Sequence, residues 1–143
     1  MPGVTVHYRF TMQWAIDEGM DALEAEAVGT ADARVDQLWP GHTKWARHFN
    51  PTAALVMAPL EWRRALAAAR SGDRAAALDH LGYSLHSVQD GVGHGLLGLN
   101  HLAYDLDIKK RDPDDWSGMP ESYHVRIERG THRAVRRFLA LTR

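Results

Sequence analysis

The sequence predicts an all-α fold, with residues 1–143 forming one compact, bundle-like helical domain. Three observations favour this fold class. Apolar residues recur at intervals of three and four in several stretches, as on one face of a helix. Glycine and proline signals separate these stretches. No stretch shows the alternation of apolar and polar residues that marks a half-buried strand.

The N-terminal quarter is predicted to hold one long helix and a connector. Residues 5–28 carry apolar side chains at helical spacing, and Gly29 is expected to end the helix. Residues 29–43 are mostly polar and contain the turn signal Pro40-Gly41. We therefore expect a surface connector between the first helix and the next helical segment.

The middle of the chain is predicted to begin with a short helical piece and continue with a long one. Residues 44–49 form the short piece, with Thr43 as its cap. Residues 52–70 are rich in alanine and leucine, which favour helix. Ser71-Gly72 is expected to end this helix.

Three further helical segments are predicted in the second half. Asp73 is placed to cap a helix over residues 74–90. A short helix is expected over 96–108, followed by a charged loop over 109–120. The last helix is expected over 121–141, because its apolar residues again follow helical spacing.

Composition excludes several classes of function. The chain has no cysteine, so disulfides, thiolate metal sites and cysteine nucleophiles are excluded. A formal net charge of −1 gives no basic patch for nucleic-acid binding. No apolar run reaches the ~20 residues of a membrane span, and no signal peptide is visible, so a cytoplasmic location is expected. Nine histidines in a chain without cysteine point to metal binding through nitrogen and oxygen ligands.

The strongest candidate ligands lie in the segment LDHLGYSLHSVQDGVGHGLLGLNH. His86 and Asp90 are four residues apart at the end of a helical run, so their Cβ atoms should lie ~5–6 Å apart on one face. Gly91 and two further glycines then break the helix while His94 is still close. The alternative is a helix end with a polar face and a flexible turn.

The last predicted helix repeats this spacing, with His124 and Glu128 four residues apart. Metal sites in helical bundles are assembled from such pairs on facing helices. The alternative for this pair alone is an exposed ion pair, which contributes less than ~1 kcal/mol. Because two separate helices carry the pattern, we expect a multi-metal site inside the bundle.

Five segments together resemble the zinc-dependent phospholipase C and single-strand nuclease superfamily, a helical fold that holds three zinc ions. They occur in the order found in that family and span most of the chain. The segments are HYRFTMQWAIDEGM, GTADARVDQ, KWARHFNP, LGYSLHSVQDGVGHG and SYHVRIERG.

The resemblance implies a ligand set for each zinc ion. The first ion would be bound by Asp36, His48, His86 and Asp90. The second would be bound by His94, His124 and Glu128. The third would be bound by His7, by Asp90 as a bridging ligand, and by the backbone of the N-terminal residue. Asp36 and Asp90 are the expected catalytic residues.

Three of these assignments leave alternatives open. Asp32 competes with Asp36, because the spacing of the segment does not decide between them. His101 is an alternative to His94. Removal of the initiator methionine would make the amine of Pro2 the terminal ligand, whereas a water molecule would otherwise complete the site.

These residue types suit zinc, which binds imidazole nitrogen and carboxylate oxygen at ~2.0–2.2 Å, although iron or manganese remains an alternative. A positively charged centre favours a phosphate anion, so the expected function is hydrolysis of a phosphoester such as a phospholipid head group or a nucleotide. The alternatives are a tailoring enzyme of a small-molecule pathway and a non-catalytic metal-binding or interaction module. Gln89, Tyr83 and Asn100 are candidate partners for ligand imidazoles. The oligomeric state is left open.

Overall fold

The structure is a computed structural model that describes residues 5–38, 53–92 and 116–143. The regular structure in these ranges is helical and includes no strand, which confirms the predicted all-α fold. None of the helices in these ranges is both long and apolar enough to cross a membrane. The elements are η1 (Thr5–Phe10), α1 (Thr11–Asp17), α2 (Ala22–Leu38), η2 (Ala53–Met57), α4 (Ala58–Arg70), α5 (Arg74–Asp90), η4 (Trp116–Gly118) and α7 (Glu121–Thr142).

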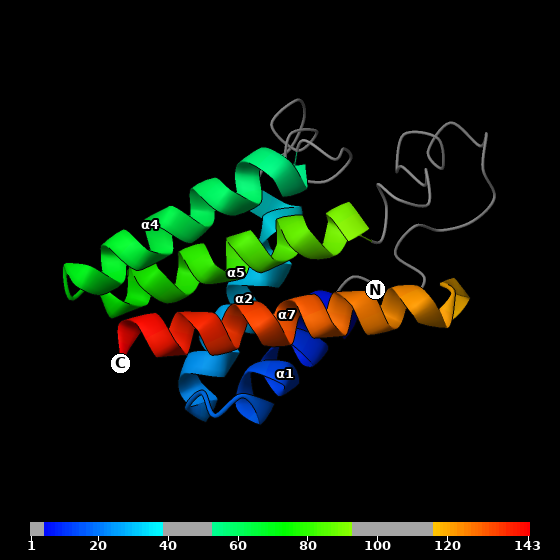
Figure 1. The fold of residues 1–143 in the computed structure, drawn as a ribbon, viewed down its shortest axis with the longest axis horizontal. Helices are drawn as coiled ribbons and strands as arrows, with labels where there is room; N and C mark the ends of the chain where they lie inside the picture. Colours follow the sequence, from blue (N-terminus) through cyan, green and yellow to red (C-terminus); the bar gives the residue numbers. More distant parts are fainter. Residues whose placement is uncertain (1–4, 39–52, 93–115) are drawn as a thin grey trace.

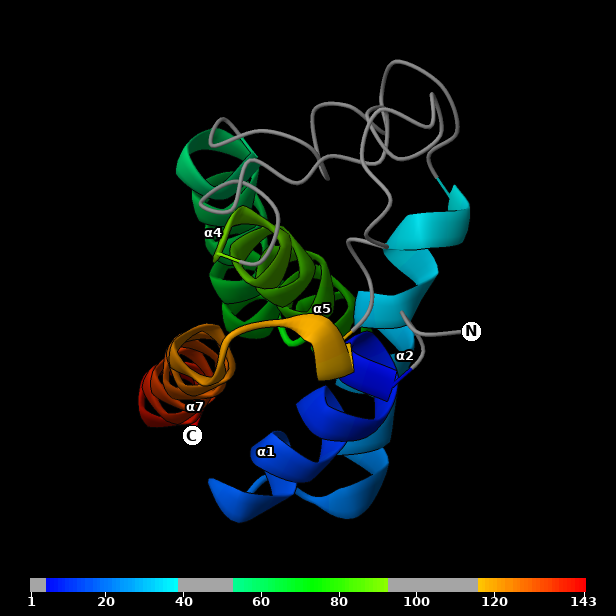
Figure 2. The same cartoon turned by 90° about the vertical axis from the view of Figure 1, so that its right-hand side faces the viewer.

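Helix α5 is the central element of the bundle. It packs against α2, α4 and α7, and Figure 1 shows α4 and α7 running along it. Ten of its 17 residues are buried, and apolar and polar side chains share its buried surface. A helix buried on most sides is expected at the centre of a bundle. In Figure 2, α1 lies at the bottom of the view, between α2 and α7, which is seen nearly end-on, and α1 contacts both helices.

The N-terminal region differs from the sequence prediction. The predicted helix over residues 5–28 is interrupted after α1 by a turn in which Gly19 has a φ of +85°, a conformation that glycine adopts without strain. Helix α2 then continues through Gly29, so the predicted helix end there was wrong, and so was the predicted connector as far as residue 38. Gly29 instead allows α2 to pack closely against η1, because a Cβ atom there would lie 2.8 Å from the Tyr8 carbonyl oxygen.

The remaining described helices follow the prediction closely. Helix α4 ends at a turn where Gly72 has a φ of +81°. The Asp73 carboxylate then accepts a hydrogen bond of 3.0 Å from the Ala76 backbone N–H and caps α5, as predicted. The last helix was predicted to within one residue. The short helices predicted over 44–49 and 96–108 lie outside the described residues.

The apolar core has a large part and a small part. The large part lies between α2, α4, α5 and α7 and includes Leu81, Leu85 and Phe138. The small part joins η1, α1 and α7 through Val6, Trp14 and Ile127. Since Val6 directly precedes His7, this second cluster holds η1 against the bundle and positions a predicted ligand.

Candidate metal centre

Three buried side chains from η1 and α5 form a group that could hold a metal ion. His7, His86 and Asp90 each offer one ligand atom, and these atoms lie within 4.8 Å of one another. The side chains are only 7%, 0% and 2% exposed. The two imidazole rings are 4.2 Å apart between centroids, with 33° between their planes. The structure thus brings a residue near the N-terminus against the pair predicted on the central helix.

Asp90 lies on the Nε2 side of both imidazoles. Its Oδ2 is 3.2 Å from His86 Nε2, and its Oδ1 is 3.4 Å from His7 Nε2. His86 and Asp90 are one turn apart on α5, so they project from the same face. Asp90 is the last residue of the helix before the C-cap Gly91. One carboxylate therefore spans the two nitrogen atoms that a metal ion would use.

A second carboxylate, Asp32 on α2, lies on the Nδ1 side of both rings. Its Oδ1 is 3.1 Å from His7 Nδ1 and 3.1 Å from His86 Nδ1. Gln89 Oε1 is also 2.9 Å from His7 Nδ1. The Thr11 hydroxyl donates a 2.7 Å hydrogen bond to Asp32 Oδ2. The two imidazoles are thus enclosed by a carboxylate on each side.

A chain of hydrogen bonds connects this group to α7. The Gln89 amide nitrogen donates to the hydroxyl oxygens of Thr11 and Thr131, at 2.8 and 3.2 Å. The Thr131 hydroxyl donates in turn to the Ile127 carbonyl oxygen at 3.0 Å. Because the amide nitrogen is committed to these hydroxyls, the Gln89 oxygen faces His7. These contacts fix residues from η1, α1, α5 and α7 around one centre.

The electrostatics of the group favour a bound cation. Burial alone would lower the pKa of His86, but the Asp90 charge and the hydrogen bonds to Asp32 and Asp90 outweigh it and raise this pKa to about 9. Burial opposes a charge on His7 as well, yet Asp32 and Asp90 raise its pKa well above 6.5. Two buried carboxylates beside two imidazoles therefore attract positive charge, which either protons or a metal ion can supply.

The structure separates the two aspartates between which the sequence left the choice open. Asp36 Oδ1 is 3.9 Å from His86 Nε2, and its side chain is 39% exposed. Asp32 is fully buried and faces Nδ1 of the same ring. Asp36 thus lies on the Nε2 side of the His86 ring, as Asp90 does, whereas Asp32 lies on the Nδ1 side.

The predicted pair on α7 does not join the group of His7, His86 and Asp90. The His124 ring stacks on Trp116, with centroids 3.9 Å apart, and its Nε2 is 2.7 Å from the Trp116 carbonyl oxygen. Glu128 is 50% exposed, and its Oε1 is 3.9 Å from His132 Nε2. In the described ranges, neither side chain belongs to a group of possible ligand atoms.

The remaining predicted ligands, His48 and His94, lie outside the described residues, as do the alternatives His101 and Pro2. Sequence reasoning missed two residues around the site, Thr11 and Thr131. Thr11 follows His7 by one helical turn and is a polar residue on an otherwise apolar face. This position could have indicated that its hydroxyl contacts the site. Thr131 had no such signal, because its role depends on how α7 packs against α5.

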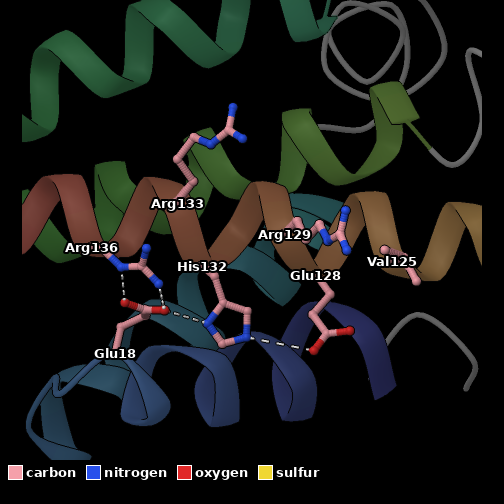
Figure 3. A pocket seen from close by; sticks show the side chains of 7 residues that line it. All are labelled: Glu18, Val125, Glu128, Arg129, His132, Arg133 and Arg136. Carbon is pink, nitrogen blue, oxygen red and sulfur yellow. Dashed lines mark hydrogen bonds and ion pairs between the residues drawn. The ribbon is translucent and has the colours of Figure 1, made fainter.

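Glu128 lines an open pocket of about 620 Å³ on α7, shown in Figure 3. His132 lies between two carboxylates there, with its Nδ1 2.8 Å from Glu18 Oε1. Arg136 donates two hydrogen bonds to Glu18, at 2.7 and 2.8 Å. The lining residues are Glu18, Val125, Glu128, Arg129, His132, Arg133 and Arg136. Glu18 therefore ties α7 to the turn after α1.

We expect Glu18→Gln to lower the melting temperature at neutral pH and to have less effect in acid. The hydrogen bonds from Arg136 and His132 hold the pKa of Glu18 below its ordinary value of 4.5 despite its burial. A lowered folded-state pKa gives stability that is present above 4.5 and is lost as the pH falls through the lower value. Thermal unfolding of wild type and variant from pH 3 to 7 measures this. Arg133→Gln is the control, and a gap between wild type and Glu18→Gln that does not change with pH would contradict the ion pair.

Comparisons of the chain with models of protein families, with curated proteins and with solved structures find no match.

Proposed function

We propose that this protein is a metal-dependent hydrolase of phosphoesters, with zinc as its metal. The observation that carries the proposal is the buried group of His7, His86 and Asp90 with its flanking carboxylate Asp32. Imidazole nitrogen and carboxylate oxygen are ligands that zinc accepts, and second carboxylates commonly hold zinc-binding imidazoles. A chain without cysteine cannot use thiolate ligands instead.

The residues of the group would divide the work between them. His7 and His86 would each bind a metal ion through Nε2, and the carboxylate of Asp90 would be shared between the two ions. Bound zinc would supply a hydroxide nucleophile at neutral pH and stabilise developing negative charge. Asp36, whose side chain is 39% exposed, would be a further ligand and more exposed than the other three. The open position that a catalytic site needs would lie on this side.

The proposed ligand set extends beyond this group. His48, His94, His124 and Glu128 would complete a cluster of two or three ions, as the resemblance implies. For His124 this requires breaking its hydrogen bond to the Trp116 carbonyl oxygen. The proposal therefore includes a rearrangement of His124 when metal binds.

Metal analysis followed by a substrate panel tests the proposal. We expect purified protein to contain two or three zinc ions per chain. It should hydrolyse a phosphodiester or phosphomonoester faster than a carboxylic ester or an amide. Removal of the metal with a chelator should abolish the activity, and added zinc should restore it. A protein that binds no metal ion would overturn the proposal. A metal-loaded protein active only on non-phosphate substrates would favour a tailoring enzyme.

A non-catalytic metal-binding module is the second candidate. The near-complete burial of His7, His86 and Asp90 favours it, because structural sites are closed to solvent. Cobalt substitution separates the two candidates. A catalytic site gives a spectrum that changes when inorganic phosphate is added, whereas a closed structural site gives a spectrum that does not.

A further inference from the structure

We propose that Asp32 is a positioning residue that fixes the tautomer and orientation of both ligand imidazoles through one carboxylate oxygen. The inference rests on the proposed metal centre and goes beyond its ligand set. In this inference Asp32 does not bind the metal but orients the residues that do. A change at Asp32 should therefore affect both His7 and His86.

The first support is the geometry at Oδ1 of Asp32. This oxygen is 3.1 Å from the Nδ1 atoms of both His7 and His86. Carboxylate and amide oxygens only accept hydrogen bonds from an imidazole, so each Nδ1 carries a hydrogen. His86 Nδ1 donates to Asp32, whereas His7 Nδ1 donates to Gln89 Oε1 at 2.9 Å and lies beside Asp32. Each Nε2 is then left on the opposite side of its ring, where Asp90 lies. Asp32, together with Gln89 at His7, thus keeps a hydrogen on each Nδ1, so Nε2 is the nitrogen at which a metal ion would replace a proton.

The second support is that both oxygens of Asp32 already have protein partners. Its Oδ1 accepts from His86 Nδ1 and lies 3.1 Å from His7 Nδ1, and its Oδ2 accepts from the Thr11 hydroxyl at 2.7 Å. Asp32 is also absent from the group of possible ligand atoms within 4.8 Å. Asp36, one turn along α2, faces Nε2 of His86 and is the matched contrast.

The third support is the close packing of the backbone that carries Asp32. A Cβ atom placed on Gly82 of α5 would lie 2.8 Å from the Asp32 backbone nitrogen. The two helices therefore touch backbone to backbone at this residue, and α2 has no room to move toward α5. Both histidines receive their orientation from a carboxylate that is itself held in place, as metal-binding sites require.

The experiment compares Asp32→Asn with Asp36→Asn in the full chain. Zinc affinity is measured by competition with a chromophoric chelator, and zinc content by elemental analysis. For Asp32→Asn we expect a 10–100-fold loss of affinity with unchanged stoichiometry at saturating zinc, the usual effect of removing a partner of a ligand imidazole. For Asp36→Asn, which would remove a ligand, we expect fewer zinc ions per chain at saturating zinc. Equal zinc affinity in Asp32→Asn and wild type would overturn the inference.

Nitrogen-15 NMR of the imidazoles provides a readout that a merely structural residue would not change. In the zinc-bound wild type, both His7 and His86 should carry hydrogen on Nδ1 and bind zinc through Nε2. In Asp32→Asn, at least one ring should lose this pattern. Zinc bound through Nδ1 of either ring in the wild type would overturn the inference even if the variant fails to fold. A wild type that binds no zinc would overturn the proposed function and this inference together, whereas the other two results would overturn this inference alone.

Discussion

Asp90→Asn should bind one or two fewer metal ions than the wild type and should lose the stabilisation that metal provides. The two oxygens of Asp90 each face one imidazole Nε2, at 3.4 and 3.2 Å. The substitution removes a negative charge and turns one of these acceptors into an amide donor. At a metal concentration 100 times the dissociation constant, the stabilisation lost is about 2.7 kcal/mol per ion. Elemental analysis and thermal unfolding, with and without chelator, measure both effects.

Asp79→Asn is the matched control for this substitution, because it removes the same charge from the same helix, outside the group of possible ligands. Its metal content should equal that of the wild type. If Asp90→Asn also kept the full metal content, Asp90 would not be a bridging ligand.

Gly82→Ala should be the most damaging single-methyl substitution at the junction of α2 and α5. The added Cβ would lie 2.6 Å from both the Ala31 Cβ and the Val28 carbonyl oxygen. These atoms belong to the α2 backbone or are attached directly to it, so no side-chain rotation relieves the clash and the helices must separate. Overpacking of this kind costs about 1–3 kcal/mol or more. We expect a fall in melting temperature of several degrees and weaker metal binding, because Asp32 moves with α2.

Gly130→Ala provides the control, since it makes the same change within a helix that has room for it. The nearest atom to a Cβ there would be Val88 Cγ1 at 3.8 Å, an ordinary contact distance. Alanine favours helix over glycine by roughly 0.5–1 kcal/mol, so this variant should be slightly more stable than the wild type. Equal effects of the two substitutions on unfolding temperature would contradict the tight crossing at Gly82.

The helices could be predicted from the sequence where local signals decide the structure. Asp73 caps α5 as its position before an alanine-rich run indicated. The two N-terminal glycines show where local signals fail. Gly19 ends the first helical segment through its positive φ, whereas Gly29 lies inside α2 and allows a close approach. Nothing in the flanking residues distinguishes these uses, because the second depends on a partner from another part of the chain.

The residues of the candidate site also fall into those that local spacing predicts and those that only tertiary packing places. The His86–Asp90 pair follows from helical spacing, so its shared face was predictable. Asp32 and Asp36 are also one turn apart on one helix, so their spacing gives no choice between them. Only the packing of α2 on α5 places one carboxylate behind the imidazole and the other beside its Nε2. The placement of Thr131 likewise depends on how α7 packs against the central helix.

The contacts around His7 and His86 join residues that are far apart in the sequence, and this affects the order of folding. Its partner Gln89 is 82 residues away in the chain, and Asp32 is 54 residues from His86. Contacts so distant in sequence form only after the intervening loops have closed. Within the group of His7, His86 and Asp90, only the last two lie close in sequence. Metal capture would therefore follow the assembly of the bundle and make its completion harder to reverse, and would not direct the early steps of folding.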